Sequence, residues 1–375
     1  MRPASGIISY MSMKINISAP ANPLGYGVVG INILKGFHSL GYDVTYWPIG
    51  QAEVDPSDAT MIQEMINNQE EYCSRVPSLK IWHQHDLAQH VGRGQHCAFP
   101  IFELDTFTKR ELCHLSQQDV IFTCSKWAAE IVLTNLSNYD PVKDYFDGIR
   151  VYTAPLGVDR KIFYDAPTSD SKNTIFLNIG KWEIRKGHDI LIQAFNRAFR
   201  EDDNVELWMM NHNPFLSEKD DLEWKRLYKS GTTANQIKFI DRVKSHQDVA
   251  DIMRMADCGV FPSRAEGWNL EALEMMSCGR QVIATDYSAH TEFCREENSH
   301  LIDIDYLESA FDGIWFKGQG NWAQLGDKQI NQLAEYMRKV HEQKQSGGDI
   351  FNLSGVETST KFSWHNTIAN MKGNL

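Results

Sequence analysis

Short apolar runs of strand length alternate with segments of helical periodicity along the whole chain, and this alternation constrains the fold more than any other feature. It is typical of the α/β class, in which parallel strands are connected by helices. In the first half of the chain we expect strands over 14–20, 43–49, 79–84, 96–103, 119–124 and 149–156. The helices of this half are expected over 28–40, 59–68, 106–116 and 126–135.

A second series follows the polar stretch YDAPTSDSKN (164–173), whose Pro, Ser and Asp residues indicate a linker. A single apolar stripe predicts a helix over 188–199, and Ser245 with Asp248 resembles a capping box that begins another. The tail is expected to form a short last helix after a loop around 346–358. The predicted strands of this series are 173–180, 205–211, 237–241, 257–263, 281–286 and 300–304.

The length and composition favour two domains. A chain of 375 residues exceeds the size at which one hydrophobic core usually stops growing, and 42% hydrophobic residues suffice for packed cores. We therefore expect two α/β domains of similar size with a cleft between them.

The net charge, the cysteines and the first residues limit the binding partners and the cellular compartment that we expect. The formal net charge of −12 argues against broad, salt-driven binding to nucleic acid or anionic lipid, although a local basic patch remains compatible with it. Seven cysteines without CxxC spacing suit buried thiols in a reducing compartment. The apolar stretch at the start is too short for a signal peptide or membrane anchor, and residues 1–12 are interpreted as an extension. We expect a soluble, cytoplasmic protein.

The glycines at positions 25, 27 and 30 fit the GxGxxG pattern between a strand and a helix. A dinucleotide site also needs an acidic residue at the end of the second strand, and that strand ends TYWPIG. A nicotinamide or flavin site is therefore disfavoured. What remains is a glycine-rich turn at Gly25 and Gly27 whose backbone N–H groups can approach an anionic or sugar ligand.

A second turn between a strand and a helix, in NIGKWEIRKGHDILIQAF (178–195), carries Lys181 and Lys186. Two ammonium groups beside a helix N-terminus favour a diphosphate. The alternative, that these lysines are ordinary solvated surface charges, stays open on this segment alone.

The stretch PSRAEGWNLEALEMMSCG (262–279) places Glu266 in a loop and Glu274 in the helix that follows. Between them the backbone of Gly267, Trp268 and Asn269 can present N–H groups to an anion. Two carboxylates on either side of an anion-binding turn suit a nucleotide sugar. A pair of glycosidase acids also needs two carboxylates, but it gives no reason for such a turn.

These segments together resemble glycosyltransferase family 4, a family of retaining enzymes that use nucleotide sugars. The resemblance rests on AEGWNLEALEMMSCGRQVIATD, on NIGKWEIRKG, and on the ordered motifs FIDRV, VFPSRAEG, QVIATDYSAHTEF and a terminal FSW helix. It covers about residues 150–375 closely and the first domain loosely. It implies the GT-B fold, with two Rossmann-like domains facing across a cleft. We expect an acceptor-binding domain over 1–165, a nucleotide-sugar-binding domain over 166–358, and a helix over 359–375 that crosses back to the first domain.

The resemblance also implies a role for each matching residue. Glu266 would contact the hydroxyls of the donor sugar, and Glu274 would hold the ribose. Lys181 and Lys186 would neutralise the departing diphosphate, although most relatives have Arg at the position of Lys181. The main chain of Gly267, Trp268, Asn269 and Leu270 would bind the phosphates, and that of Asp241, Arg242 and Val243 would border the base.

Glu103 and Asp105 are expected at the carboxyl end of a strand, facing the cleft. Many relatives have a His near this point that contacts the sugar. One interpretation is that Glu103 or Asp105 contacts the donor sugar or the acceptor. The other is that Asp105 with Thr106 caps the next helix.

Two groups could suggest a metal, and we assign none. His83 and His85 would share one face of a strand, but no further ligand spacing supports zinc. Asp303 and Asp305 mimic the DxD motif of the other glycosyltransferase fold but fall on a late strand of the second domain. GT-B enzymes generally need no bound divalent ion, so we expect no cofactor, with the nucleotide sugar as co-substrate.

The sequence therefore predicts a metal-independent retaining glycosyltransferase that moves a sugar from a nucleoside-diphosphate sugar, such as a UDP- or GDP-sugar, to an acceptor hydroxyl. The acceptor, a saccharide, a lipid-linked glycan or a modified nucleic-acid base, stays open, as does the oligomeric state. The alternatives are a phosphorylase or epimerase on the same fold, and a nucleotide-sugar-binding module without catalysis.

Overall fold

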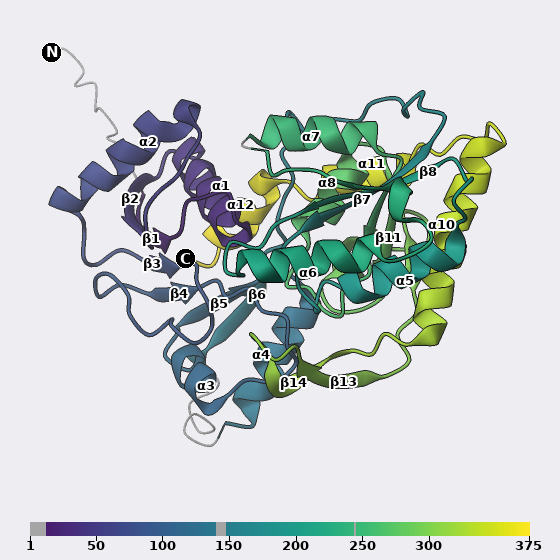
Figure 1. Cartoon of the computed structure of the whole chain (residues 1–375). Coiled ribbons are helices and arrows are strands. Elements are labelled where there is room, and N and C mark those ends of the chain that lie inside the picture. The colour runs from purple at the N-terminus through teal and green to yellow at the C-terminus, as the bar shows by residue number, and fades with distance from the viewer. Residues whose placement is uncertain (1–12, 140–147, 244) are drawn as a thin grey trace, which may run out of the picture.

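Two six-stranded parallel sheets, one in each half of the chain, form the framework of the protein (Figure 1). The computed structural model describes residues 13–139, 148–243 and 245–375. The first sheet has the strand order β2-β1-β3-β4-β5-β6 and the second the order β12-β11-β10-β7-β8-β9. All pairings within these two sheets are parallel, so the predicted α/β class and the two Rossmann-like sheets are confirmed.

The strands match the predicted apolar runs but are mostly shorter. The first sheet contains β1 (Lys14–Ala19), β2 (Asp43–Pro48), β3 (Ser78–Lys80), β4 (His96–Ala98), β5 (Val120–Thr123) and β6 (Arg150–Thr153). The second contains β7 (Thr174–Gly180), β8 (Val205–Asn211), β9 (Ile237–Phe239), β10 (Cys258–Phe261), β11 (Gln281–Thr285) and β12 (His300–Ile302). A separate antiparallel hairpin consists of β13 (Leu307–Phe311) and β14 (Lys317–Ala323). Central strands such as β5, β7 and β10 are buried on both faces, which explains their continuous apolar sequences.

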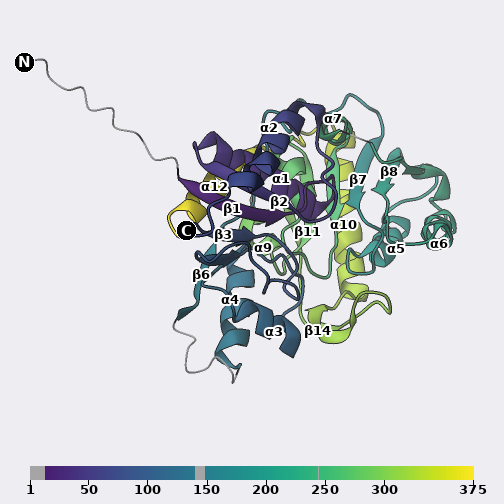
Figure 2. The ribbon, with the colours of Figure 1, turned by 90° about the vertical axis from the view of Figure 1, so that its left-hand side faces the viewer.

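Helices connect the strands and cover the sheets (Figures 1 and 2). Those of the first half are α1 (Gly25–Ser39), α2 (Pro56–Asn67), α3 (Lys109–Leu115) and α4 (Lys126–Ser137). Those of the second half are α5 (His188–Ala198), α6 (Glu218–Lys229), α7 (His246–Met255), α8 (Leu270–Ser277), α9 (His290–Phe293), α10 (Asp327–Gln345), α11 (Leu353–Lys361) and α12 (Trp364–Lys372). Two 3-10 turns lie at Asn68–Glu71 and Ala234–Gln236. Ser245 caps α7 as predicted, since its side chain accepts a hydrogen bond from the Asp248 N–H at 3.1 Å.

Three predicted boundaries are wrong at positions that matter for the site. Helix α1 begins at Gly25, so the glycines of GxGxxG lie inside its first turns and not in a preceding loop. Strand β4 ends at Ala98, and Glu103 lies in the irregular segment that follows, not at the strand end. Helix α3 begins at Lys109 with Thr108 and Glu111 as a reciprocal capping box, so Asp105 with Thr106 is not its cap.

Three further expectations need correction. Strand β3 ends at Lys80, so His83 and His85 do not share a strand face. Asp303 lies just beyond the end of β12, and Asp305 pairs with Lys328 at 2.6 Å. The loop expected around 346–358 is partly helical, because α11 begins at Leu353 with Asn352 as its cap.

The end of the chain returns to the first domain, as predicted. Helix α11 lies against α8, and α12 lies against α1 and β6 (Figure 1). Ile368 of α12 is fully buried and faces Gly36 of α1. The Thr367 hydroxyl donates a hydrogen bond to the Pro155 carbonyl at 2.6 Å. The domain boundary between residues 165 and 166 stays a prediction.

Within the described ranges, no helix is both long and apolar enough to cross a membrane. Five of the seven cysteines are buried, as expected from their apolar surroundings: Cys97, Cys124, Cys258, Cys278 and Cys294. The predicted extension, residues 1–12, lies outside the described residues.

Candidate functional site

Strands β7 and β10 are neighbours in the second sheet although about 80 residues separate them in sequence. The chain leaves β7 toward β8 on one side, and β10 leads to β11 on the other, so this pair marks the point where the strand order reverses. In open parallel sheets the crevice at the carboxyl ends of such a pair is the usual ligand site. The loops after β7 and β10 carry the two predicted motifs, so the topology brings them together.

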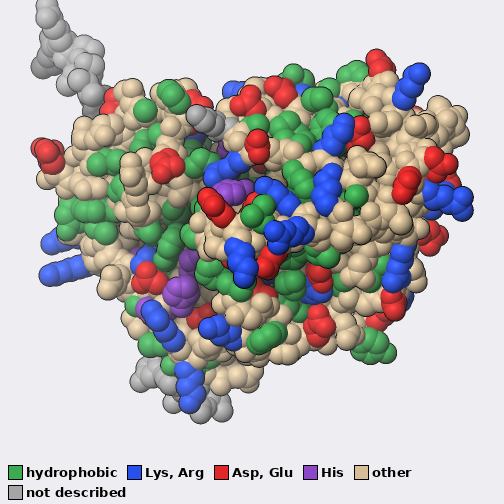
Figure 3. Space-filling view, in the orientation of Figure 1, with side chains coloured by type: hydrophobic (Ala, Val, Ile, Leu, Met, Phe, Trp, Pro, Cys, Tyr) green, Lys and Arg blue, Asp and Glu red, His purple; other side chains and the backbone are tan. Residues whose placement is uncertain are grey.

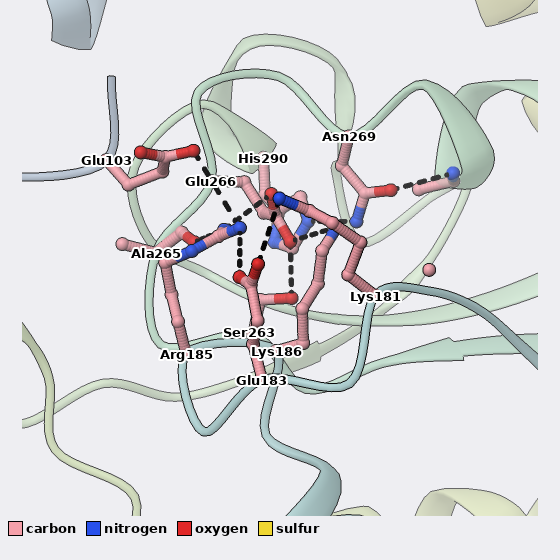
Figure 4. A network of polar contacts seen from close by, with 12 residues as sticks. Glu103, Lys181, Glu183, Arg185, Lys186, Ser263, Ala265, Glu266, Asn269 and His290 are labelled. Carbon is pink, nitrogen blue, oxygen red and sulfur yellow. Dashed lines mark hydrogen bonds and ion pairs between the residues drawn. The ribbon is translucent and has the colours of Figure 1, made fainter. Parts of the chain in front are cut away.

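Glu266 is the centre of a buried polar cluster that joins these loops (Figure 4). Its carboxylate lies 2.9 Å from Lys186 Nζ and 3.0 Å from Arg185 Nη1, and it accepts a hydrogen bond from the Ser263 hydroxyl at 2.7 Å. Burial alone would raise the pKa of Glu266, but Lys186 and Arg185 outweigh burial and lower the pKa far below its usual range. The carboxylate is therefore a fixed anion that can accept hydrogen bonds but cannot donate a proton at neutral pH.

Arg185 is a member of this cluster that the sequence interpretation missed. Its guanidinium contacts Glu183 at 2.8 Å, Glu266 at 3.0 Å and the Ala265 carbonyl at 2.8 Å, and its side chain is only 5% exposed. It also lies 3.7 Å from Glu103 of the first domain. A signal was available, because Arg185 is a third cation directly beside Lys186 in a loop with a single acid. Arg185 holds carboxylates from three segments, one of them across the domain boundary.

Lys181 is the more accessible of the two predicted lysines. Its ammonium group lies 3.0 Å from Glu183, and its side chain is 39% exposed, against 11% for Lys186. It also lies 5.7 Å from the centre of the Phe215 ring. Lys181 can therefore reach a ligand from the rim, whereas Lys186 would meet one from within the cluster.

The start of α8 adds a backbone feature. Asn269 has a φ of +79°, and its side chain accepts from the Ala272 N–H and contacts His290 at 2.8 Å. Gly267 lies tightly against the first domain, since a Cβ on it would be 2.5 Å from the Ile101 side chain. Trp268 is buried and packs on Phe293, so its indole ring belongs to the core. The turn points the N-terminal end of α8 toward the cluster, which favours an anion there.

Glu274 lies on α8 one turn beyond its start and is half-buried. Its carboxylate has no hydrogen bond or ion pair with another residue among those described. Burial, with a smaller contribution from Glu271, raises the pKa of Glu274 well above its usual range. The protein thus keeps a poorly solvated carboxylate without a partner at the edge of the site.

A pocket of about 220 Å³ opens at the carboxyl ends of β8 and β9. It is lined by both predicted base-site residues Asp241 and Arg242, whereas Val243 lies just beyond it. Figure 3 shows Lys and Arg side chains in the middle of this face, interspersed with Asp and Glu. The remaining lining residues are Met209, Asn211, His212, Asp221, Lys225, Phe239 and Ile240.

The two predicted acids of the first domain differ in their surroundings. Glu103 faces Arg185 across the domain boundary, and burial raises its pKa in spite of Arg185. Asp105 instead accepts two hydrogen bonds from Asn321 of β14, at 2.8 Å from the backbone and 3.0 Å from the side chain. Glu103 belongs to the cluster, and Asp105 attaches the hairpin to the first domain.

The glycines of α1 are explained by close packing. A Cβ on Gly27 would be 2.2 Å from the Asn22 carbonyl, and one on Gly30 would be 2.0 Å from that of Pro20, whereas Gly25 faces open space. The Tyr26 hydroxyl donates to the Ile101 carbonyl at 2.7 Å, which fixes the segment before Glu103 against the start of α1. Among the described residues, the hydrogen bonds and ion pairs of the Glu266 side chain join it to Arg185, Lys186 and Ser263, and to neither Gly25 nor Gly27.

The histidines of the first domain do not form a metal site in the described part of the chain, where no group of three or more His, Cys, Asp or Glu residues has a suitable arrangement. His83 and His85 stack with ring centres 5.3 Å apart. Burial, His85 and the charge of Lys181 lower the pKa of His83 to about 4, so it is neutral at physiological pH.

Comparison with known proteins finds a family model that matches part of the chain and solved structures that share its fold. Residues 173–313 match the model of the family described as glycosyl transferases group 1. A D-inositol 3-phosphate glycosyltransferase of Arthrobacter sp. is 29% identical over 168 residues, which are 42% of this chain and 37% of the relative. The lipopolysaccharide core biosynthesis mannosyltransferase LpsB of Rhizobium meliloti is 34% identical over 138 residues, 36% of this chain and 38% of the relative. The chain thus spans less than two fifths of the length of these curated relatives.

Solved structures match over nearly the whole chain. Sucrose-phosphate synthase from Thermosynechococcus elongatus has a TM-score of 0.67 at 14% identity, covering 96% of this chain and 98% of its own. HepE of Anabaena in complex with UDP-glucose has a TM-score of 0.65 at 17% identity, covering 97% and 100%. The fold is therefore GT-B, as predicted.

Proposed function

We propose, on the premise that its second domain belongs to the glycosyl transferases group 1 family, that this chain transfers a sugar from a nucleoside-diphosphate sugar to an acceptor hydroxyl with retention of anomeric configuration. The observation that carries the proposal is the buried contact of 2.9 Å between Lys186 and Glu266. The two residues come from separate predicted motifs, on the loops that follow β7 and β10, the strands at which the sheet order reverses. Such a site offers one cation for a phosphate and one permanent anion for sugar hydroxyls.

The proposed donor lies along the carboxyl edge of the second sheet. Its base would enter the pocket at Asp241 and Arg242, and its ribose hydroxyls would donate to Glu274. The diphosphate would contact Lys181, Lys186 and the start of α8. The sugar would contact Glu266. This arrangement gives Glu274 the partner that it lacks among the described residues.

The cations of the cluster could stabilise a diphosphate as it leaves. Three cations, Lys181, Arg185 and Lys186, face three carboxylates, so binding an anion requires the lysines to exchange part of their contacts with Glu183 and Glu266. Arg185 would remain with Glu266 during this exchange and keep its carboxylate oriented.

In the proposed step the bond between the anomeric carbon and the phosphate oxygen breaks, and the diphosphate leaves with the electron pair. The acceptor oxygen bonds to the same face of the anomeric carbon, and its proton passes to the departing phosphate oxygen. Lys181 and Lys186 stabilise the negative charge that grows on the diphosphate. No protein nucleophile takes part, which fits a Glu266 that is held by two cations.

The donor is tested by thermal shift with UDP-, GDP-, ADP- and dTDP-sugars. UDP-glucose, found bound to HepE, and GDP-mannose, named for a mannosyltransferase of Neurospora crassa that is 23% identical over 187 residues, come first. Lys186→Ala and Glu266→Ala should each abolish the shift, and Lys219→Ala, an 84% exposed lysine on α6, should keep it. If donor affinity is unchanged in both Lys186→Ala and Glu266→Ala, these two residues do not hold the donor and the proposed site is wrong.

A donor-hydrolysis assay and product analysis separate the alternatives. A sugar phosphate would indicate a phosphorylase, and an epimerised nucleotide sugar an epimerase. Donor binding without hydrolysis or transfer across saccharide, lipid-linked and nucleic-acid acceptors would indicate a binding module. Activity that survives a strong chelator would support independence of metal.

A further inference from the structure

The tip of the β13–β14 hairpin exposes large apolar side chains beside the proposed site. Trp315 is 47% exposed, and Phe215, from the loop before α6, is 60% exposed. Their rings meet edge to face with centres 5.9 Å apart. We name this pair the aromatic platform and infer that it binds a saccharide ring of the acceptor. The inference rests on the proposed function and extends it to the acceptor side.

The hairpin holds Trp315 in a defined position. One carboxylate oxygen of Asp312 accepts hydrogen bonds from the backbone N–H groups of Ile314, Trp315 and Phe316, all at 2.8–2.9 Å. Phe316 packs against the buried Trp322 with ring centres 5.3 Å apart. These hydrogen bonds fix the backbone that carries Trp315, so less of the tip has to be ordered when the exposed ring binds a ligand.

A continuous series of contacts joins the platform to the buried cluster. The Phe215 ring lies 5.7 Å from Lys181 Nζ, which pairs with Glu183 at 3.0 Å. Glu183 in turn pairs with Arg185 at 2.8 Å, next to Glu266. The platform therefore lies at the rim of the proposed reaction site, on the side of its exposed lysine.

The hairpin also touches the first domain, where the acceptor is expected. Asn321 of β14 binds Asp105, two residues from Glu103. Figures 1 and 2 place β14 at the edge of the first domain, close to α3 and α4. A ligand that spans Glu103 and the platform would thus contact both domains.

The chemistry of the platform favours a saccharide over other occupants. The apolar C–H face of a sugar ring packs on an aromatic ring, and its hydroxyls need nearby polar groups. Exposed Lys317 and Gln319 follow the tip, and Figure 3 shows hydrophobic side chains mixed with charged ones in this region. The exposed apolar side chains here are few, namely Phe215, Phe311, Ile314 and Trp315, whereas a stable protein interface takes about 20–30 residues on each side. The net charge of −12 disfavours an anionic membrane.

The test measures binding of labelled protein to an array of immobilised oligosaccharides of glucose, mannose, galactose and N-acetylglucosamine, with the nucleotide that gives a thermal shift present. We expect Trp315→Ala to weaken binding roughly tenfold. Trp315→Tyr, which keeps a ring, should restore most of it. The matched control is Tyr306→Ala, which removes a 73% exposed aromatic ring at the base of the same hairpin and should not change binding.

Separate measurements distinguish failure of the platform from failure of the proposed function. The thermal shift by nucleotide reports the donor site and should persist in Trp315→Ala, which also shows that the variant is folded. No glycan binding by the wild type, or equal binding by Trp315→Ala, overturns the inference and leaves the donor site intact. It is also overturned if Trp315→Ala instead loses sedimentation with phosphatidylglycerol vesicles, which points to a membrane, or loses self-association, which points to a second copy.

Discussion

Glu274 combines an energetic cost to the fold with a proposed role in binding. Its half-buried carboxylate has a raised pKa and no partner among the described residues, so the folded protein binds its proton more tightly than the unfolded chain does. Its contribution to stability is therefore fully present below the unfolded pKa of about 4.3 and is lost as pH rises through the folded pKa. Residues that weaken the fold in this way are often found at functional sites.

We predict that Glu274→Gln raises the melting temperature at pH 7.5 and weakens nucleotide binding at the same time. The amide removes the cost of a poorly solvated charge but accepts hydrogen bonds from a ribose less strongly. The gain in melting temperature should shrink as pH falls toward 4, because the carboxyl is then protonated in the unfolded chain as well as in the folded protein. The same substitution at Glu223, a 57% exposed residue of α6, serves as control. A destabilised Glu274→Gln protein would contradict this account.

Arg185 has the opposite energetic role, because it neutralises carboxylates that are already buried. Removing one partner of a buried ion pair costs about 3–5 kcal/mol, and Arg185→Met leaves Glu183 and Glu266 with only one cation each. The charge of Arg185 lowers the pKa of both acids, so the stability it provides is present above their unfolded pKa and lost as pH falls.

We therefore predict that Arg185→Met lowers the free energy of unfolding by about 3 kcal/mol at pH 7 and by less near pH 2, because the folded pKa of Glu266 lies far below its usual range and the carboxylate stays ionised until the pH falls through that pKa. Urea unfolding at both pH values measures the difference. Arg197→Met, which removes a 40% exposed arginine on α5, should cost little at either pH. A loss that does not depend on pH would mean that Arg185 acts through packing alone.

At the scale of elements, the sequence predicted best where one segment determines its own structure. Eleven of the twelve sheet strands fall within the predicted apolar runs, and β3 begins one residue before its run, at Ser78. Burial on both faces explains the continuous apolar sequences of central strands such as β5, β7 and β10. Strand ends were wrong where apolar residues continue beyond the hydrogen-bonded ladder, as in LKIWHQ and HCAFPIFE. There the side chains stay buried after the ladder ends, as at Ile81 and Phe99, and a sequence pattern cannot distinguish this from burial within the ladder.

For the candidate site too, the sequence predicted residues that belong to one motif and missed contacts between distant segments. Lys186 and Glu266 were predicted from their own motifs, and the fold places them together. Arg185 and the link between Asp105 and Asn321 depend on contacts between segments far apart in sequence. The pairing of Asp105 with β14 joins residues 216 positions apart, and a local pattern marks Asp105 but not its partner Asn321.

The hairpin gives a prediction at this scale. Asp105 accepts both hydrogen bonds that attach β14 to the segment before α3, so Asp105→Ala should free the hairpin from the first domain. We predict faster amide hydrogen exchange at Asn321 and its neighbours in β14, with exchange in β7 unchanged. Asp303→Ala, on the other side of the hairpin near Lys328, should leave exchange in β14 unaltered. Unchanged exchange in Asp105→Ala would show that packing of Trp322 alone holds β14.

At the scale of the whole molecule, several contacts join the two domains around the proposed site. They include Glu103 with Arg185, Asp105 with Asn321, and the Lys126 N–H with Glu292 at 2.8 Å. Helix α12 adds a contact on the far side from the hairpin, where the end of the chain packs on α1. Because closure of two domains around a ligand can be part of a catalytic cycle, we predict that the packing of α12 on α1 affects activity as well as stability.

The contact between Gly36 and Ile368 allows this packing to be tested. A Cβ on Gly36 would lie 2.4 Å from Ile368 Cγ1, so Gly36→Ala should cost about 1 kcal/mol net, since overpacking exceeds the gain in helix propensity. Ile368→Ala leaves a cavity beneath a fully buried side chain and should cost about 2–5 kcal/mol.

In the double variant the methyl group at position 36 occupies part of the space that Ile368 vacates. We predict that the two substitutions together cost less than their sum, with a coupling of about 0.5–3 kcal/mol in urea unfolding. Gly373→Ala, whose added Cβ meets nothing within 4 Å, combined with Ile368→Ala should be additive. If Gly36→Ala and Ile368→Ala were also additive, α12 would not pack on α1 in solution. Donor hydrolysis by the same variants then shows whether this packing affects activity. If the packing of α12 on α1 supports closure of the two domains, the variants that weaken it should hydrolyse the donor more slowly.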